Sequence, residues 1–267
     1  MLICKVICIQ SLSSGSRGNA IYISSDTTRI LVDVGLNMTQ LKKRCAIAGI
    51  DLDTIDAVLV THEHSDHIIG LKDFFNLYTS DLYLHTDTVD VINCVPTHMI
   101  KTFDKQFTIG DITVDHFPVP HDSRFCFGYS FKNGDTKISL ATDLGRIGDD
   151  IINAMNGSQI VMLECNHDLL KLSHNRKYPH FLKRRITASS GHLSNPSCAL
   201  ACSKLAKMGV TQIILAHISS ENNSPNLAYS FVKDFLEKQG IIEGRDIWID
   251  VATQDCPTVA FICGDCK

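Results

Sequence analysis

The segment Thr61-His62-Glu63-His64-Ser65-Asp66-His67 constrains this chain more than any other. It places three imidazoles and a carboxylate in H-x-H-x-D-H order, directly after the apolar run 57–60, which has the character of a buried strand. A polar loop at the end of a strand is held in place, so His62 and His64 can face one ion while Asp66 and His67 face a second. Imidazole nitrogen and carboxylate oxygen suit zinc, manganese or iron. The alternative is a polar loop that holds histidines by chance, and the order of the residues favours a metal site.

Two further candidate ligands follow predicted strands. His116 and His121 compete as third ligand of the first ion. His116 lies within the alternating pattern of a half-buried strand, whereas His121 lies at its end, so we select His121. An Asn133-Gly134 turn predicts a hairpin whose second strand ends at Asp143. This carboxylate could cap the next turn, but beside the other ligands it is well placed to bridge two cations.

A last histidine, His217, ends the apolar run 212–216. The candidates then form two sets of ligands with one bridging carboxylate, which is the inventory of a two-metal hydrolase. The first set comprises His62, His64 and His121, the second comprises Asp66, His67 and His217, and Asp143 lies between them. Two divalent ions held there would lower the pKa of a shared water to near 7.

The net charge and the cysteine content limit where the protein can be located and what it can bind. The net charge is −4, so the chain as a whole does not attract nucleic acid. The apolar run 1–9 is short and is interrupted by Lys5, which favours a first strand over a signal peptide or membrane span. Eleven cysteines, scattered through predicted strands and helices, indicate buried free thiols. We therefore expect a cytoplasmic protein without membrane contact. The pair Cys263 and Cys266 is interpreted as reduced surface thiols rather than a metal or redox site.

Strands and helices alternate throughout the chain, with hairpins in both halves and no linker or repeat. This pattern predicts an α/β protein with one domain over residues 1–267, in which two mixed β-sheets pack face to face between outer helices. Helices are predicted over residues 38–48, 68–77, 89–94, 196–208 and 227–239. The first strand is predicted over residues 3–9, before a glycine- and serine-rich loop at 11–19.

The metal motif resembles the signature of the metallo-β-lactamase superfamily, and motifs across nearly the whole chain resemble the YycJ/WalJ-type nucleases within it. These motifs are Ser-Leu-Ser-Ser-Gly-Ser-Arg-Gly-Asn at 11–19, His121-Asp122, Thr-Asp-Leu-Gly at 142–145, Leu-Glu-Cys-Asn-His-Asp at 163–168, Gly-His-Leu-Ser-Asn at 191–195 and Leu-Ala-His-Ile-Ser-Ser-Glu-Asn-Asn at 215–223. The resemblance implies an αββα sandwich, two divalent metal ions and 5′-to-3′ exonuclease activity on DNA. The chain is too short for the additional β-CASP domain of related RNA-processing enzymes.

The resemblance also implies roles for individual residues. Asp33 would brace the histidine loop, and Asp66 would orient the attacking hydroxide. His192 would contact the scissile phosphate and stabilise its charge, with His167 and Glu164 orienting it. Attack would break the P–O3′ bond and leave a 5′-phosphate. Candidate substrate contacts are Ser190, Ser219, Asn222, Lys183, Arg184 and Arg185, and the loop 13–17 is a further candidate for the terminal phosphate.

The basic residues belong to a longer run that also carries Tyr178, His180 and Phe181. Such a run is usually a solvated face, but beside a phosphodiesterase site it is a plausible track for a nucleic-acid backbone. Two other functions remain open. A thioesterase or lactamase of the same fold would share the metals but would not need His192 or the basic run. A metal-stabilised binding protein would lack turnover altogether.

Overall fold

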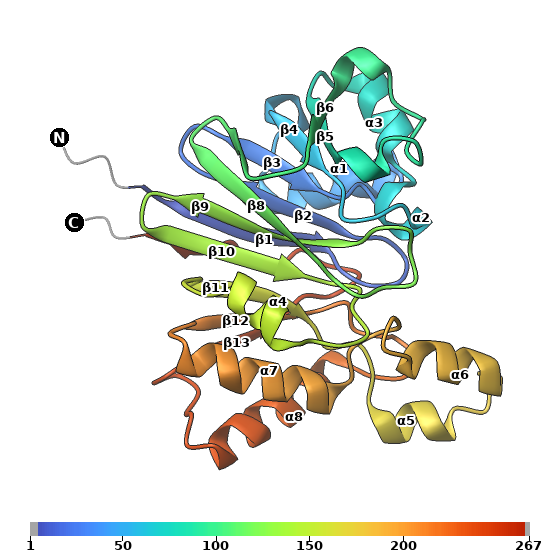
Figure 1. The fold of residues 1–267 in the computed structure, drawn as a ribbon, viewed down its shortest axis with the longest axis vertical. Helices are drawn as coiled ribbons and strands as arrows, with labels where there is room; N and C mark the ends of the chain where they lie inside the picture. Colours follow the sequence, from blue (N-terminus) through green and yellow to red (C-terminus); the bar gives the residue numbers. More distant parts are fainter. Residues whose placement is uncertain (1–4, 265–267) are drawn as a thin grey trace.

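Two seven-stranded β-sheets pack face to face, with helices on both outer surfaces (Figure 1). The structure is a computed structural model that describes residues 5–264. The first sheet has the order β14 (Phe261–Cys263), β1 (Ile7–Ser13), β2 (Ala20–Ser24), β3 (Arg29–Val32), β4 (Ala57–Leu59), β5 (Asp81–His85), β6 (Ile100–Phe103). The second has the order β13 (Trp248–Val251), β12 (Gln212–Ala216), β11 (Ile160–Glu164), β10 (Thr136–Ala141), β9 (Phe127–Asn133), β8 (Ile112–Pro118), β7 (Phe107–Ile109). The predicted αββα sandwich is therefore confirmed.

Helices flank the sheets, and three short 3₁₀ turns lie in the connections from α1 to β4 and from β5 to β6. The helices are α1 (Met38–Ala48), α2 (Ser65–Ile68), α3 (Leu71–Leu77), α4 (Asp149–Ala154), α5 (Leu169–His174), α6 (His180–Thr187), α7 (Asn195–Lys207) and α8 (Pro225–Lys238). The 3₁₀ turns are η1 (Leu52–Thr54), η2 (Thr86–Thr88) and η3 (Thr97–Met99). Within residues 5–264, none of the helices is long and apolar enough to cross a bilayer.

Strand alternation explains the layers. In β3, Ile30 and Val32 point into the core between the sheets, whereas Leu31 points outward and packs with Leu41 of α1. The second sheet behaves in the same way, because Met162 of β11 faces the core between the sheets and its neighbours face α7 and α8. Strands such as β3 and β11 are thus covered on both faces, which explains why they are almost continuously apolar in sequence.

Each sheet is parallel in one half and antiparallel in the other. Strands β3 to β6 run parallel in the first sheet, and β10 to β13 run parallel in the second. In such sheets, ligand sites form beyond the carboxyl ends of parallel strands. Asp33, His62, Asp143 and His217 follow β3, β4, β10 and β12 respectively, so the topology delivers candidate residues from both sheets to one edge of the sandwich.

Three sequence predictions of local structure are wrong. Residues 89–94 form turns and irregular backbone rather than a helix, although Ile92 and Val95 are buried; the segment lies between the 3₁₀ turns η2 and η3, and Pro96 follows it. The predicted helix at 68–77 is interrupted at Gly70, because its N–H donates to the carbonyl of Val34. Strand β1 starts at Ile7 and continues to Ser13, so the glycine-rich loop begins later than predicted.

Most cysteines behave as predicted: Cys45, Cys126, Cys165, Cys198 and Cys202 are buried free thiols. Cys263 is buried rather than at the surface, because β14 pairs with β1 at the edge of the first sheet. Cys4 and Cys266 lie outside the described residues.

Gly35 allows three backbone segments to meet beneath the metal motif. Its N–H donates to the carbonyl of Asn19 at 2.8 Å, and the N–H of Asn19 donates to the carbonyl of Asp66 at 2.8 Å. A Cβ at position 35 would collide with that same Asp66 carbonyl. The loop after β1, the loop after β3 and helix α2 can therefore approach one another only when residue 35 is glycine.

We expect Gly35→Ala to destabilise the protein strongly, because backbone atoms of Asp66 cannot move aside as a side chain can. Overpacking of this kind costs about 1–3 kcal/mol, and each kcal/mol lowers Tm by about 2–4 °C in a chain of this size. Thermal unfolding followed by circular dichroism measures the effect. Gly148→Ala is the matched control, since its Cβ would meet only the movable carboxylate of Asp150. Equal Tm values for the two variants would contradict this role of Gly35.

Candidate metal centre

Three histidines form the first cluster: His62 from the end of β4, His64 at the start of α2, and His121 from the loop after β8. His121 Nε2 lies 3.2 Å from His64 Nδ1, and the His62 and His121 ring centroids are 5.0 Å apart. His116, the competing candidate, packs instead against the rings of His85 and Phe127 within the first and second sheets. The structure therefore brings His121, and not His116, to this cluster.

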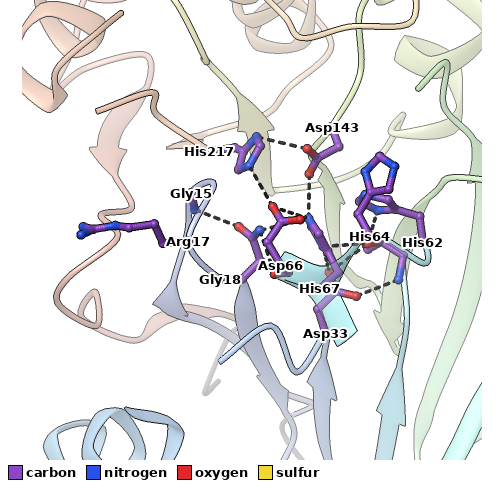
Figure 2. A network of polar contacts seen from close by, with 12 residues as sticks. Gly15, Arg17, Gly18, Asp33, His62, His64, Asp66, His67, Asp143 and His217 are labelled. Carbon is purple, nitrogen blue, oxygen red and sulfur yellow. Dashed lines mark hydrogen bonds and ion pairs between the residues drawn. The ribbon is translucent and has the colours of Figure 1, made fainter. Parts of the chain in front are cut away.

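The second cluster joins the two sheets and is drawn in Figure 2, where its side chains converge. His67 Nε2 lies 3.7 Å from Asp66 Oδ2, and that same carboxylate oxygen lies 4.0 Å from His217 Nε2. Asp143 stands between the clusters: its Oδ2 is 3.2 Å from His67 Nε2, and its Oδ1 is 3.9 Å from His121 Nε2. In each cluster the ligand atoms lie within 4.8 Å of one another. All seven predicted ligands are thus gathered at one place.

The buried donor atoms fit two divalent metal ions. His62 Nε2, His217 Nε2 and Asp143 Oδ2 are shielded from water and make no hydrogen bond within the described chain. A buried polar atom without a partner costs roughly 1–3 kcal/mol. Because these atoms point into the space between the clusters, bound cations would remove that cost. The fold and the donor set agree that divalent metal ions belong here.

Burial and neighbouring charges set the protonation of the ligands. Burial lowers the pKa of His62 well below its usual range. Burial would lower the pKa of His67 as well, but the carboxylates of Asp33 and Asp143 outweigh it and raise that pKa well above its usual range. Burial opposes ionisation of Asp143, yet the imidazoles of His217 and His67 hold its pKa well below the ordinary value. Asp143 therefore favours its ionised form, and His67 would release a proton on binding a cation.

Asp33 holds the metal motif from behind. Its carboxylate is fully buried and accepts hydrogen bonds from the backbone N–H and the hydroxyl of Thr61, at 2.8 and 2.9 Å. The same carboxylate lies 2.7 Å from His67 Nδ1. A hydrogen bond at Nδ1 fixes the ring and leaves Nε2 directed at the metal position. Asp33 thereby has the position behind the histidine loop that the family resemblance implies.

Three residues of the centre have left-handed backbone conformations: Asp33 with φ 64°, Asp143 with φ 59° and His217 with φ 53°. They are the non-glycine residues with positive φ in the described chain, and each follows a strand. Aspartate and histidine tolerate this region better than most residues. Such strained positions concentrate at functional sites because they redirect a side chain at the end of a strand.

Glu164, at the end of β11, organises the second sheet's side of the centre. Its Oε1 lies 2.8 Å from both His192 Nδ1 and His217 Nδ1, and its Oε2 accepts from the N–H groups of Leu144 and Leu193. Burial opposes the charge, but His192 and these hydrogen bonds lower the pKa of Glu164 to about 2. Burial likewise disfavours the His192 imidazolium, but Glu164 raises the pKa of His192 to about 9.

Asp143, Glu164, His192 and His217 are close enough to hold a third ion. We interpret this group as a hydrogen-bonded support instead, because Glu164 already satisfies both imidazoles. His192 then keeps Nε2 available, and its side chain remains 24% exposed.

His167 does not contact His192 through a hydrogen bond. Its ring is buried, neither nitrogen has a hydrogen-bond partner among the described residues, and burial lowers its pKa to about 4. Its backbone carbonyl accepts from the N–H of Asn195 at the start of α7. Glu164, rather than His167, holds the position from which His192 can be oriented.

The predicted substrate contacts divide into two groups. Ser219 lines a pocket of about 270 Å³ next to His192, together with Ser16, Asn166, Tyr178 and Arg185. Ser190 is half-buried beside it. Asn222 is buried, and its Oδ1 accepts from Asn175 at 2.7 Å, so the structure does not bring it to the pocket.

Lys183, Arg184 and Arg185 lie on α6, where Arg184 and Arg185 are exposed. Arg185 forms an ion pair with Asp122, the neighbour of His121. The helix is therefore tied directly to the edge of the metal centre.

Two supporting residues were absent from the sequence predictions. Asn19 Nδ2 lies 3.0 Å from His67 Nε2, and Thr61 connects Asp33 to the ring of His62 at 3.0 Å. The position of Thr61 immediately before the motif was the one available signal. Asn19 lies 48 residues from its partner, and no local pattern predicts that contact.

Comparison with known proteins agrees with this geometry. Residues 28–218 match the family described as the β-lactamase superfamily domain. The chain is 34% identical over 253 residues to an exodeoxyribonuclease YycJ of Bacillus anthracis, covering 92% of this chain and 96% of the relative. It is 30% identical over 256 residues to an exodeoxyribonuclease WalJ of Streptococcus pneumoniae, covering 92% and 94%.

Among solved structures, the metallo-β-lactamase fold protein YhfI from Bacillus subtilis superposes with a TM-score of 0.72 at 15% identity, covering 97% of this chain and 100% of that one. This likeness supports the fold alone. The sequence identities, extending over more than nine-tenths of each chain, assign the family more closely. The chain belongs to the β-lactamase superfamily, and within it to the family of the YycJ and WalJ exodeoxyribonucleases.

Proposed function

We propose that this protein is a metal-dependent phosphodiesterase that degrades DNA from the 5′ end. The observation that carries the proposal is the pair of ligand clusters joined by Asp143, with His192 beside them in a position to contact a phosphate. The relatives at 34% and 30% identity are named exodeoxyribonucleases, which supports DNA as the substrate class. A cytoplasmic location and a single domain remain predictions from the sequence.

The cofactors proposed are two divalent cations, with zinc, manganese and iron as the candidates. When bound, they would supply Lewis acidity, which makes a water nucleophilic near neutral pH and offsets charge on the phosphate. His62, His64 and His121 would hold one, while Asp66, His67 and His217 would hold the other, with Asp143 shared.

The chain's own residues would position the reacting groups. Asp66 is the least buried of the acidic ligands, with 24% of its side chain exposed, so its second oxygen can accept a hydrogen bond from the attacking water. His192 is protonated because Glu164 raises its pKa to about 9, although burial opposes this. Its Nε2–H can then donate to a phosphate oxygen or to the leaving O3′, where negative charge develops.

The competing functions fit less well. A thioesterase or lactamase would use the same metals, but His192 at the pocket wall, whose pKa Glu164 raises to about 9 although burial opposes this, suits an anionic phosphodiester better. A binding protein without turnover would not need Asp66, a member of the second ligand cluster, to remain partly exposed.

The first test of the proposal is degradation of end-labelled DNA. We expect release of mononucleotides from the 5′ end of single- or double-stranded DNA with manganese, zinc or magnesium, and no release by Asp66→Ala. Parallel reactions use RNA and substrates with 5′-phosphate or 5′-hydroxyl ends. They define which nucleic acid and which 5′ end the enzyme prefers. If no metal supports cleavage while a thioester or lactam is hydrolysed, the nuclease assignment is wrong.

Metal stoichiometry tests the ligand assignment. His64→Ala should retain the fold, because His64 is only partly buried, yet bind about one divalent ion fewer than the parent's expected two. Elemental analysis after dialysis and a thermal melt measure both properties. His116→Ala is the matched control and should keep the full metal content. Loss of folding in His64→Ala alone would instead indicate a structural metal.

His192→Ala distinguishes phosphate contact from metal binding. Removing one preorganised donor to a developing charge lowers kcat by about 10²–10³-fold. We expect that loss with unchanged metal content, since Glu164 and not a cation holds His192 Nδ1. A variant that loses a metal equivalent together with activity would instead place His192 among the ligands.

A further inference from the structure

Residues 169–190, here called the arm, project from the layered body of the protein, where α5 and α6 are seen in Figure 1. The arm consists of α5, a turn, α6 and the segment leading to Gly191. Leu172 is its one buried residue. A segment of this length that buries so little is not explained by its contribution to the core.

The arm differs sharply in charge from the remainder of the protein. It contains six lysines and arginines and no aspartate or glutamate, whereas the whole chain has 25 basic and 29 acidic residues. The remainder therefore carries 19 basic against 29 acidic residues. A concentrated positive surface on an otherwise acidic protein provides local attraction for a polyanion.

One face of α6 combines this charge with an exposed aromatic ring. Phe181, Arg184 and Arg185 have i, i+3, i+4 spacing and therefore share a face of the helix. Phe181 is 68% exposed, while Leu182 and Ile186 are half-buried on the other side. An amphipathic helix places its largest apolar side chain inward. Phe181 has the opposite placement, because its ring faces solvent. There it is free to stack on an aromatic surface of a partner.

The arm also forms a wall of the pocket at the metal centre. Tyr178 and Arg185 line that pocket together with His192 and Ser219. A strand whose scissile phosphate lies at His192 would leave the pocket across this wall and meet α6. Lys183 and Lys177 are engaged with Ser173 and Glu221, but Arg184 has no ion pair with any residue of 5–264.

We propose that the arm is the binding surface for single-stranded DNA leading from the metal centre, with Phe181 stacked on a base and Arg184 contacting the phosphate backbone. The proposal rests on the nuclease function proposed above. Single-stranded DNA is the substrate class because bases in a duplex already stack on one another, whereas an unpaired base offers its face to an aromatic side chain. A second copy of this chain fits less well, since two arms would bring like charges together.

The test compares Phe181→Ala/Arg184→Ser with Ile47→Ala/Lys43→Ser in the full chain. The control removes one exposed apolar and one exposed basic side chain from α1, with the same loss of charge, on another helix. Binding of a fluorescent 20-nucleotide oligothymidylate and of a 20-base-pair duplex is followed by anisotropy, with EDTA present to prevent hydrolysis. Circular dichroism verifies folding, and the single variants separate the two contributions.

We expect Kd for the single strand to rise about tenfold or more in the arm variant, because stacking and a phosphate contact are lost together. The slope of log K against log salt should fall in magnitude by about 0.7 with Arg184→Ser alone. Phe181→Ala should weaken single-strand binding and leave duplex binding unchanged. The control should match the parent.

Equal single-strand affinity in the two double variants would overturn the proposal. A dimer in sedimentation that Phe181→Ala dissociates would also overturn it and assign the face to a second copy. Binding is measured without hydrolysis, so the two proposals fail separately. If the nuclease function is wrong, the arm variant still loses single-strand binding, but the parent protein does not cleave DNA. Cleavage by the parent together with unaltered binding by the arm variant would remove the arm proposal and leave the nuclease function.

Discussion

Carboxyl groups buried among imidazoles are the constraint on which the rest of the structure depends. Asp33, Asp143 and Glu164 are each almost completely shielded from water, and a buried charge is tolerated only when several donors or cations compensate it. Asp33 is compensated by Thr61 and His67, and Glu164 by two imidazoles and two backbone N–H groups. Asp143 has His67 and His217 within 3.2 and 3.3 Å, but its Oδ2 makes no hydrogen bond within the described chain. The loops at the strand ends are fixed in position because they carry the donors that these buried carboxylates need.

The sequence was most informative where chemistry and periodicity agreed. The H-x-H-x-D-H motif, His121, Asp143 and His217 were all placed at strand ends, and the structure brings these side chains close to one another. The sandwich followed from alternating strands and helices. Prediction failed where contacts between distant parts of the chain determine the local structure. Gly70 interrupts a helix because it contacts Val34, and Asn222 is buried beneath α5. The second role of Glu164, holding His217 as well as His192, depends on strand order, which no local pattern contains.

The two sheets contribute unlike parts to one centre. The first sheet supplies the motif loop and its brace, whereas the second supplies Asp143, Glu164 and His217. Neither half holds a complete ligand set, so the packing of the two sheets against a shared core is itself a condition for the chemistry. This explains why an ordinary apolar core and a strained polar edge occur together: the rigid core holds the unfavourable backbone conformations at Asp33, Asp143 and His217 in place.

The loop beside Asp66 is closed by residues from the far end of the chain. Ser13 Oγ donates to the carbonyl of Gln254, Gln254 donates back to Ser13 and Gly18, and β14 pairs with β1. Contacts across some 240 residues form late in folding, since loop closure over such distances is slow. The position of the loop that faces the metal motif therefore depends on contacts with residues 254–263, which lie some 240 positions away in the sequence.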